Sequence, residues 1–109
     1  PSISVSVASF EINDFSFAAK FIAKVLDNLE ALKIDNFHIL NINVPDHNQF
    51  PDPQVKITKT FLNEFEAEKN LEESDRKNLD DGFISVSPIK IDMHNSSELE
   101  AVEAWSKNL

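Results

Sequence analysis

Residues 38–46 read HILNINVPD, and this stretch decides the fold. Apolar side chains alternate with asparagines from Leu40 to Val44, a period of two that is typical of a strand with one buried face. Pro45 then ends the pattern, because proline has no amide hydrogen with which to continue a ladder. We therefore predict a strand over 39–44 that ends in a loop.

The segment before this strand predicts another strand and then a helix. Residues 2–8 alternate serines with β-branched side chains, which indicates a strand. From residue 14 to 32, apolar residues recur three and four positions apart, as on one face of a helix, and Asn13 or Asp14 is the expected N-cap. The apolar positions of this helix are Ala18, Phe21, Ile22, Val25, Leu26, Leu29 and Leu32.

Two more strands are expected after the central one. Residues 55–60 alternate, with Val55 and Ile57 on one face. Residues 83–87 alternate again up to Pro88, where we expect the strand to halt or bulge. Between them, residues 61–81 hold eight acidic and three basic side chains, a local charge of −5. Such a segment is either a solvated helix or a mobile loop.

The C-terminal residues predict a second long helix. Ser97 and Glu100 have the spacing of a capping box. An apolar stripe follows, which we expect to dock on a sheet: Leu99, Val102, Trp105 and Leu109. The order of elements favours an α/β fold, a mixed sheet with two flanking helices. We expect it to be incomplete, because doubly wound sheets normally have five or six strands.

Composition narrows the range of functions. A chain of 109 residues fits one domain over 1–109, and the absence of cysteine excludes disulfides, thiolate metal sites and a cysteine nucleophile. The single glycine, Gly82, leaves no glycine-rich phosphate loop. A net charge of −9 with one arginine, Arg76, argues against binding nucleic acid. No secretory signal or membrane-length apolar run is present, so we expect no membrane partner and a cytoplasmic location.

The histidines are weak candidates for a site. None of the three stands four residues from another, the spacing that places two metal ligands on one helical face. His47 follows Asp46 and precedes Asp52, so it could polarise a phosphate or complete a cation site, but an exposed loop histidine is favoured. The other two are His94, beside Asp92 and Asn95 in an expected turn, and His38, expected to pack or cap at the start of a strand.

The acidic residues offer one further candidate. Asp80 and Asp81 followed by Gly82 could bind a hard divalent cation, but such pairs follow a strand and this one precedes it, so a turn is favoured. Residues 64–81 lack the pattern of an EF-hand loop, and no serine is flanked by nucleophile-elbow glycines. We therefore assign no catalytic residue and no metal ligand to the chain, and leave the substrate-binding residues open.

Three stretches together resemble the SurE survival-protein family of metal-dependent nucleoside monophosphate phosphatases. The most distinctive is LNINVP, residues 40–45, which resembles the family's LNVNVP. Together with the following VKITKT (55–60), similar to VTR, it forms one of the three stretches. The other two are PSISVSVAS (1–9), similar to IPSIAVS, and DGFISVSPIKID (81–92), similar to GYVSVTPL. In addition, FSFAAKFIAKVL (15–26) is similar to the helix that the family places between the first two.

The resemblance implies which parts are absent. The family binds its divalent cation through two aspartates of an NDDG motif and a serine and an asparagine, all upstream of the stretch that residues 1–9 resemble. It therefore implies a C-terminal portion with a partial Rossmann-like sheet that lacks the N-terminal half and, alone, lacks catalysis. Mg²⁺ or Mn²⁺ and a nucleoside monophosphate are implied only for the complete fold. Two departures from the family pattern stand out. Residues 61–81 form a shorter segment than the family has between these two strands, so the contacts by which the family usually forms oligomers are in doubt. Lys59 stands where the family commonly has arginine, and lysine cannot form the same two-pronged contact with a carboxylate or phosphate.

Because the strand pattern begins at residue 2 without an initiating methionine, we expect the chain to be a piece of a longer protein. Its partner would then be the missing N-terminal half or a second copy of the chain.

Two alternatives to the phosphatase stay open. The first alternative is a non-catalytic module that associates with itself or with another protein through an open sheet edge. The second is an acidic module that responds to calcium.

Overall fold

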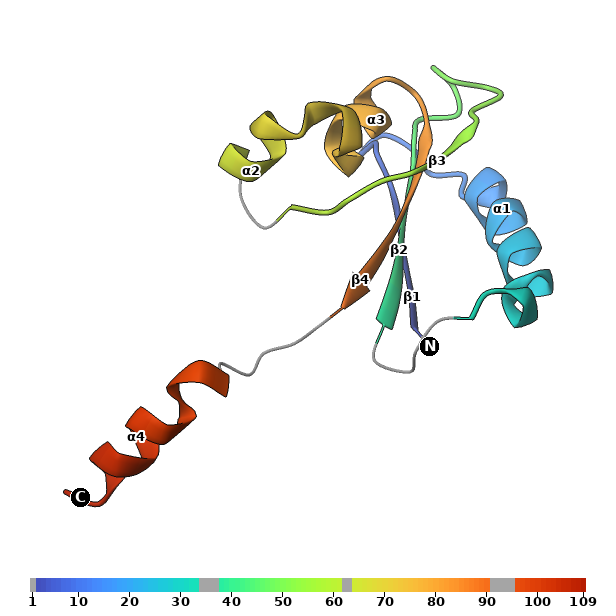
Figure 1. Cartoon of the computed structure of the whole chain (residues 1–109). Coiled ribbons are helices and arrows are strands. Elements are labelled where there is room, and N and C mark those ends of the chain that lie inside the picture. The colour runs from blue at the N-terminus through green and yellow to red at the C-terminus, as the bar shows by residue number, and fades with distance from the viewer. Residues whose placement is uncertain (1, 34–37, 62–63, 91–95) are drawn as a thin grey trace.

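A computed structural model describes residues 2–33, 38–61, 64–90 and 96–109. Its strands form one sheet in the order β1-β2-β4-β3 (Figure 1). The strands are β1 (Ser2–Val7), β2 (His38–Val44), β3 (Val55–Ile57) and β4 (Ile84–Lys90). β1 pairs with β2 and β3 with β4 in parallel, whereas β2 and β4 are antiparallel. The predicted mixed α/β sheet is therefore confirmed.

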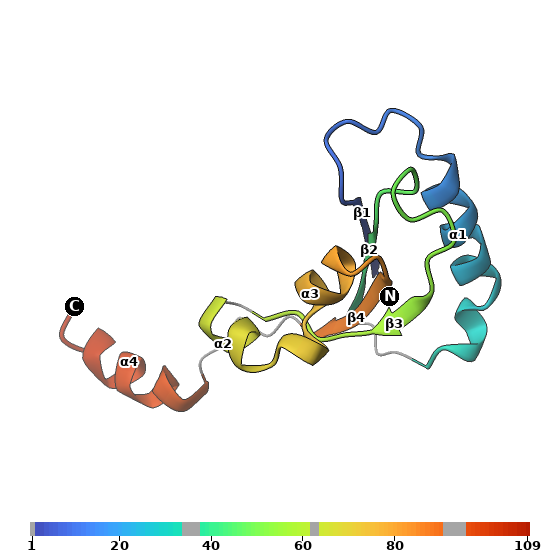
Figure 2. The ribbon, with the colours of Figure 1, turned by 90° about the horizontal axis from the view of Figure 1, so that it is seen from above.

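Helices lie on both faces of this sheet. Figure 2 shows α1 and α3 on opposite sides of the strands, with α4 apart from them. The α-helices are α1 (Ser16–Asp27), α2 (Glu64–Lys69), α3 (Asp75–Asp80) and α4 (Leu99–Ser106). Short 3₁₀ turns are η1 (Leu29–Ala31), η2 (Leu71–Glu73) and η3 (Ser96–Glu98). The two helices that flank the sheet are thus α1 and α3, not α1 and the C-terminal helix.

The core lies between α1 and one face of the sheet. The strand register places Ile3 beside Leu40 and Val5 beside Ile42, so the β-branched residues of β1 share a face with the apolar residues of β2. Ile42 is completely buried there. The buried cluster is Ala18, Leu40, Ile42, Val44 and Ile84, and Phe17, Phe21, Ile22 and Val25 of α1 pack against it. The alternation in the sequence therefore predicted the buried face correctly.

The opposite face of the sheet is polar, and α3 covers part of it. Ser85 and Ser87 of β4 are fully buried on this face. Ser87 Oγ shares a hydrogen bond of 2.7 Å with Thr58 Oγ1, and Asn43 Nδ2 donates to Ser85 Oγ at 3.3 Å. Within the described ranges, no buried side-chain nitrogen or oxygen lacks a hydrogen-bond partner. This polar layer is therefore tolerated, because its groups are satisfied.

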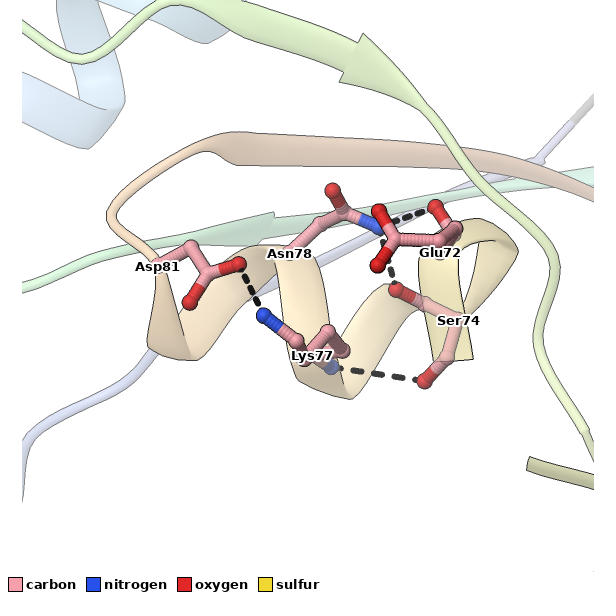
Figure 3. A network of polar contacts seen from close by, with 5 residues as sticks. All are labelled: Glu72, Ser74, Lys77, Asn78 and Asp81. Atoms are coloured by element: carbon pink, nitrogen blue, oxygen red, sulfur yellow. Dashed lines mark hydrogen bonds and ion pairs between the residues drawn. The ribbon is translucent and has the colours of Figure 1, made fainter. Parts of the chain in front are cut away.

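The acidic segment forms helices. Of the two alternatives predicted for residues 61–81, the solvated helix fits α2, on which Phe65 is 62% exposed. α3 instead packs on the sheet, and Ser74 caps it by accepting a hydrogen bond of 3.3 Å from the Lys77 amide. Asn78 is the buried residue of α3, and its Nδ2 donates to the carbonyls of Glu72 and Ser74 (Figure 3).

The docking of the C-terminal stripe on the sheet was predicted wrongly. No residue of α4 is buried, and Trp105 is 59% exposed. The physical reason is that α1 already covers the apolar face, while the other face presents serines and asparagines that an apolar stripe cannot match. The α-helix also begins after Glu98 as N-cap, without a side-chain capping bond, so the capping box predicted from Ser97 and Glu100 does not mark its start.

Strand boundaries differ from the prediction at two places. β4 continues through Pro88 to Lys90, because β3 pairs only with residues 84–86 and Pro88 thus lies where that side of β4 is an edge. β3 ends at Ile57 rather than at 60, because Lys59 turns toward η2 and its amide donates to the Glu73 carbonyl at 2.7 Å.

Two further local features concern β3 and the start of α1. Val55 and Ile57 lie on one face of β3 as predicted, and Ile57 is 70% exposed because β3 is the outer strand of the sheet. At the start of α1 the N-cap is Phe15, without a side-chain capping bond. Asp14 still contributes there, because its Oδ1 accepts from the Ser16 amide at 2.9 Å.

Candidate functional site

The described strands bring several loops together at one edge of the sheet. β1 and β2 are parallel, so their carboxyl ends lie side by side, and antiparallel β4 begins at the same edge. In open α/β sheets, ligands bind beyond the carboxyl ends of the strands. A hollow of about 110 Å³ lies here, lined by Ala8, Pro45, Asp46, Gln49, Phe50, Leu79 and Asp80.

The loop after β2 is held by Asp46. Its Oδ1 accepts from the Asn48 amide at 2.9 Å. Its carbonyl accepts from the amides of Gln49, at 3.1 Å, and Phe50, at 2.8 Å. This carboxylate therefore already has a role in ordering the turn that forms one wall of the hollow.

Phe50 forms another wall, and it depends on Gly82. Gly82 has a φ of +91°, and a Cβ built there would lie 2.3 Å from Phe50 Cδ1. Only glycine therefore allows the phenyl ring to close on the turn between α3 and β4. Sequence reasoning missed Phe50, although the single glycine of the chain was an available signal for such a close approach.

His47 is not brought together with the predicted acidic partners into one site. Its ring stacks on Phe17 of α1, with centroids 6.0 Å apart and 20° between the planes. His47 is half-buried rather than exposed. Asp52 lines a different hollow from the one that Asp46 lines. The favoured prediction, an exposed loop histidine, is therefore confirmed for its place in a turn but wrong for its exposure, because the ring packs against Phe17.

The other two histidines add little. His38 begins β2 opposite Lys90. His94 and its neighbours Asp92 and Asn95 lie outside the described residues.

The Asp80–Gly82 stretch forms the predicted turn. Asp80 ends α3 and lines the hollow, while Asp81 forms an ion pair with Lys77 (Figure 3). The hydrogen bond to Asp81 raises the pKa of Lys77 above its usual 10.5.

Lys59, the residue that departs from the family pattern, forms an ion pair with Glu73 at 3.1 Å.

The hollow offers few groups for cation chemistry. Its acidic lining residues are Asp46 and Asp80. In the part of the chain that the structure describes, no three histidine or acidic side chains are placed to hold a metal ion. Since Mg²⁺ and Ca²⁺ take six or more oxygen ligands, these residues do not fit such a cation by themselves. The acidic run 64–81 forms α2 and α3 rather than a ligand loop.

Comparison with known proteins identifies the family. The family model described as survival protein SurE matches residues 1–67. The chain belongs to the SurE family. This confirms the resemblance seen in LNINVP and its neighbours, and the SurE match covers both β1 and β2, whose carboxyl ends form the hollow.

Individual SurE relatives agree with this family over the whole chain. The 5'-nucleotidase SurE of Pseudoalteromonas atlantica is 28% identical, over 96% of this chain and 51% of the relative. That of Fervidobacterium nodosum is 31% identical, over 99% and 51%. The crystal structure of the SurE protein from Aquifex aeolicus has the same fold, with a TM-score of 0.66 at 19% identity, over 97% of this chain and 52% of that one. The chain thus spans about half the length of the curated relatives it matches.

No described helix is both long and apolar enough to cross a membrane.

Proposed function

We propose that this chain is the C-terminal portion of a SurE-type, metal-dependent nucleoside monophosphate phosphatase. The observation that carries the proposal is the coverage: nearly the whole chain aligns with about half of relatives named 5'-nucleotidase SurE. By the resemblance, the cation ligands of the family lie upstream of the stretch matched by residues 1–9. The missing half would then supply both the metal ligands and most of the substrate site.

The role of this chain in the complete fold is structural. It holds β1 and β2 in parallel, so that their carboxyl ends form one edge on which a ligand site can be built. The hollow at that edge, about 110 Å³, is well below the roughly 300–1,000 Å³ of small-molecule pockets. Its size and its two carboxylates support the proposal that the isolated chain has no phosphatase activity. Mg²⁺ or Mn²⁺ and the nucleoside monophosphate belong to the complete fold.

The proposal extends to location and partners. A cytoplasmic location suits a phosphatase whose substrates are nucleoside monophosphates. The partner would be the other half of a longer SurE chain or a second copy of this one. A direct role in binding nucleic acid is disfavoured by the net charge of −9.

Phosphate release tests the catalytic part of the proposal. The 109-residue chain is incubated with nucleoside monophosphates and Mg²⁺ or Mn²⁺, and the full-length 5'-nucleotidase SurE of Pseudoalteromonas atlantica is assayed in parallel as the active control. We expect phosphate from the control alone. Turnover by the chain that survives repurification and disappears in the Asp46→Asn, Asp80→Asn double variant would show that the chain has a catalytic site of its own.

One observation favours the second candidate, a non-catalytic self-associating module. Large apolar side chains are exposed beside the open edge of β1, among them Val5, Phe15 and Leu26, which are 40%, 57% and 54% exposed. Exposed apolar patches at a free strand edge are typical of pairing surfaces.

A further inference from the structure

We propose that a hollow at the start of β3 and β4 binds the base of the nucleoside monophosphate, and that Asp52 makes guanine the preferred base. The inference adds a substrate-binding part to the structural role of this chain. It rests on the proposed function, because that proposal supplies the class of ligand.

Two short segments of the chain build this hollow. They are residues 49–54, which lead into β3, and residues 82–83, which lead into β4. The volume is about 460 Å³, within the roughly 300–1,000 Å³ of small-molecule pockets. We call it the Phe83 hollow. In the strand order β3 and β1 stand at opposite ends, so the Phe83 hollow does not depend on what lies beyond β1.

The Phe83 hollow adjoins the smaller hollow at the ends of β1 and β2. Gln49 and Phe50 line both of them. The smaller hollow is also lined by Asp46 and Asp80. Acidic side chains accept hydrogen bonds from ribose hydroxyls in dinucleotide-binding folds. A nucleoside can therefore lie across the two hollows, with its base in the larger one and its ribose at the sheet edge.

The phenyl rings of the Phe83 hollow suit a planar base. Lys56 Nζ lies over the Phe83 ring, 5.1 Å from its centroid, although Lys56 itself does not line the hollow. The ammonium group therefore holds this ring in place from outside the hollow. The second ring, that of Phe50, is fixed by its close contact with Gly82. Bases stack on aromatic side chains such as these, because every base has a flat π face.

The charge of the Phe83 hollow favours a base over a phosphate. Among the residues that line it in the described structure, Asp52 alone is charged. A carboxylate repels a phosphate, whereas a base is uncharged. The lining also includes Gln49 and Gln54, whose amide groups can both donate and accept hydrogen bonds. A flat, uncharged ligand with polar edges therefore fits this hollow.

Asp52 gives the Phe83 hollow a preference among bases. Its side chain is exposed, and within the described ranges no other residue donates a hydrogen bond to its carboxylate. Guanine carries two adjacent donors, the N1–H and the amino group at C2, and one carboxylate can accept from both at once. Hypoxanthine lacks this amino group and offers the N1–H alone. Asp52 therefore favours guanine over hypoxanthine.

An NMR titration of the 109-residue chain tests the base site. Guanosine monophosphate (GMP) is added with EDTA, so that no cation takes part, and at about 0.15 M salt, which screens the net charge of −9. We expect the amide signals of Gln49, Gln54 and Phe83 to shift, with a dissociation constant in the millimolar range, as for a single stacked base. Inosine monophosphate (IMP), which carries hypoxanthine, should bind about 5-fold more weakly. Ribose 5-phosphate, which has no base, should leave these signals unchanged.

Two variants are compared with matched controls, and circular dichroism checks that each is folded. Phe83→Leu keeps an apolar side chain but removes the ring, so GMP should bind about 10-fold more weakly. Its control is Phe65→Leu on α2, because Phe65 also has a lysine over its ring, Lys69 at 4.3 Å. Asp52→Asn should abolish the preference for GMP over IMP. Asp27→Asn, the same change at an exposed position of α1, should retain that preference.

The outcomes separate the ideas. Unchanged signals at about 20 mM GMP, shifts confined to other residues, or equal shifts with ribose 5-phosphate overturn the base site. GMP binding that Phe83→Leu leaves unchanged overturns it as well. Equal binding of GMP and IMP by the wild type overturns the role of Asp52 alone. Phosphate release decides the phosphatase proposal separately, because catalysis by the isolated chain would refute that proposal and leave the measured base binding as it is.

Discussion

Replacing Gly82 by alanine should destabilise the chain through two separate effects. The residue has a φ of +91°, where an L side chain costs about 1–2 kcal/mol. The added Cβ would also lie 2.3 Å from Phe50 Cδ1, so the phenyl ring must move. Overpacking of this kind typically costs about 1–3 kcal/mol. We expect a total loss of about 2–5 kcal/mol in the free energy of unfolding, a large share of the stability of a small domain.

A double-mutant cycle separates the two effects. In the Phe50→Ala background the ring is absent, so Gly82→Ala should cost only the backbone part, about 1–2 kcal/mol. Urea unfolding followed by far-ultraviolet circular dichroism measures all four proteins, with Phe50→Ala alone as the control. If Gly82→Ala costs less than about 0.5 kcal/mol, or costs the same in both backgrounds, the close approach of the ring to the turn is wrong.

Three further predictions follow from single contacts. Ile42→Ala removes a completely buried side chain and should lower the free energy of unfolding, measured in urea, by about 2–5 kcal/mol. Ile57→Ala, at a 70% exposed position, should lower it by less than about 0.5 kcal/mol. Equal losses would contradict the assigned core. Ser74→Ala removes the cap of α3 and should cost about 1 kcal/mol, with faster amide exchange confined to α3; unchanged exchange there would count against the cap. The side chain of Ser16 and, second in effect, its backbone amide form hydrogen bonds to Asp14 that lower the pKa of this carboxyl below 3.8. The ionised Asp14 therefore stabilises the folded chain above pH 3.8, and this stabilisation is lost as the pH falls through the lowered pKa. An NMR titration should show this low pKa, and it should return toward 3.8 in Ser16→Ala.

Patterns within short stretches were sufficient to predict most elements. β1, β2 and α1 lie within a few residues of their predicted ranges, because alternation and the three-to-four spacing are local consequences of which face is buried. The buried face of β2 followed for the same reason. The family motif LNINVP falls in this best-predicted strand.

Features that depend on distant parts of the chain were not predictable. Whether the stripe on α4 docks depends on what covers each face of the sheet, and the sequence does not say that α3 lies over the polar face. The hollow joins Ala8, Asp46 and Asp80, which only the strand order brings together. The exposure of Ile57 likewise depends on β3 being the outer strand.

The position of Trp105 has a practical consequence for optical measurements. It is the only tryptophan of the chain, and it lies on α4, away from the buried cluster (Figure 1). Melting of the sheet should hardly alter its emission spectrum, so a fluorescence melt would miss the loss of the core. Capture of α4 by any apolar surface should instead shift the emission to shorter wavelength and raise its anisotropy. The indole is thus a natural probe of what the C-terminal arm touches.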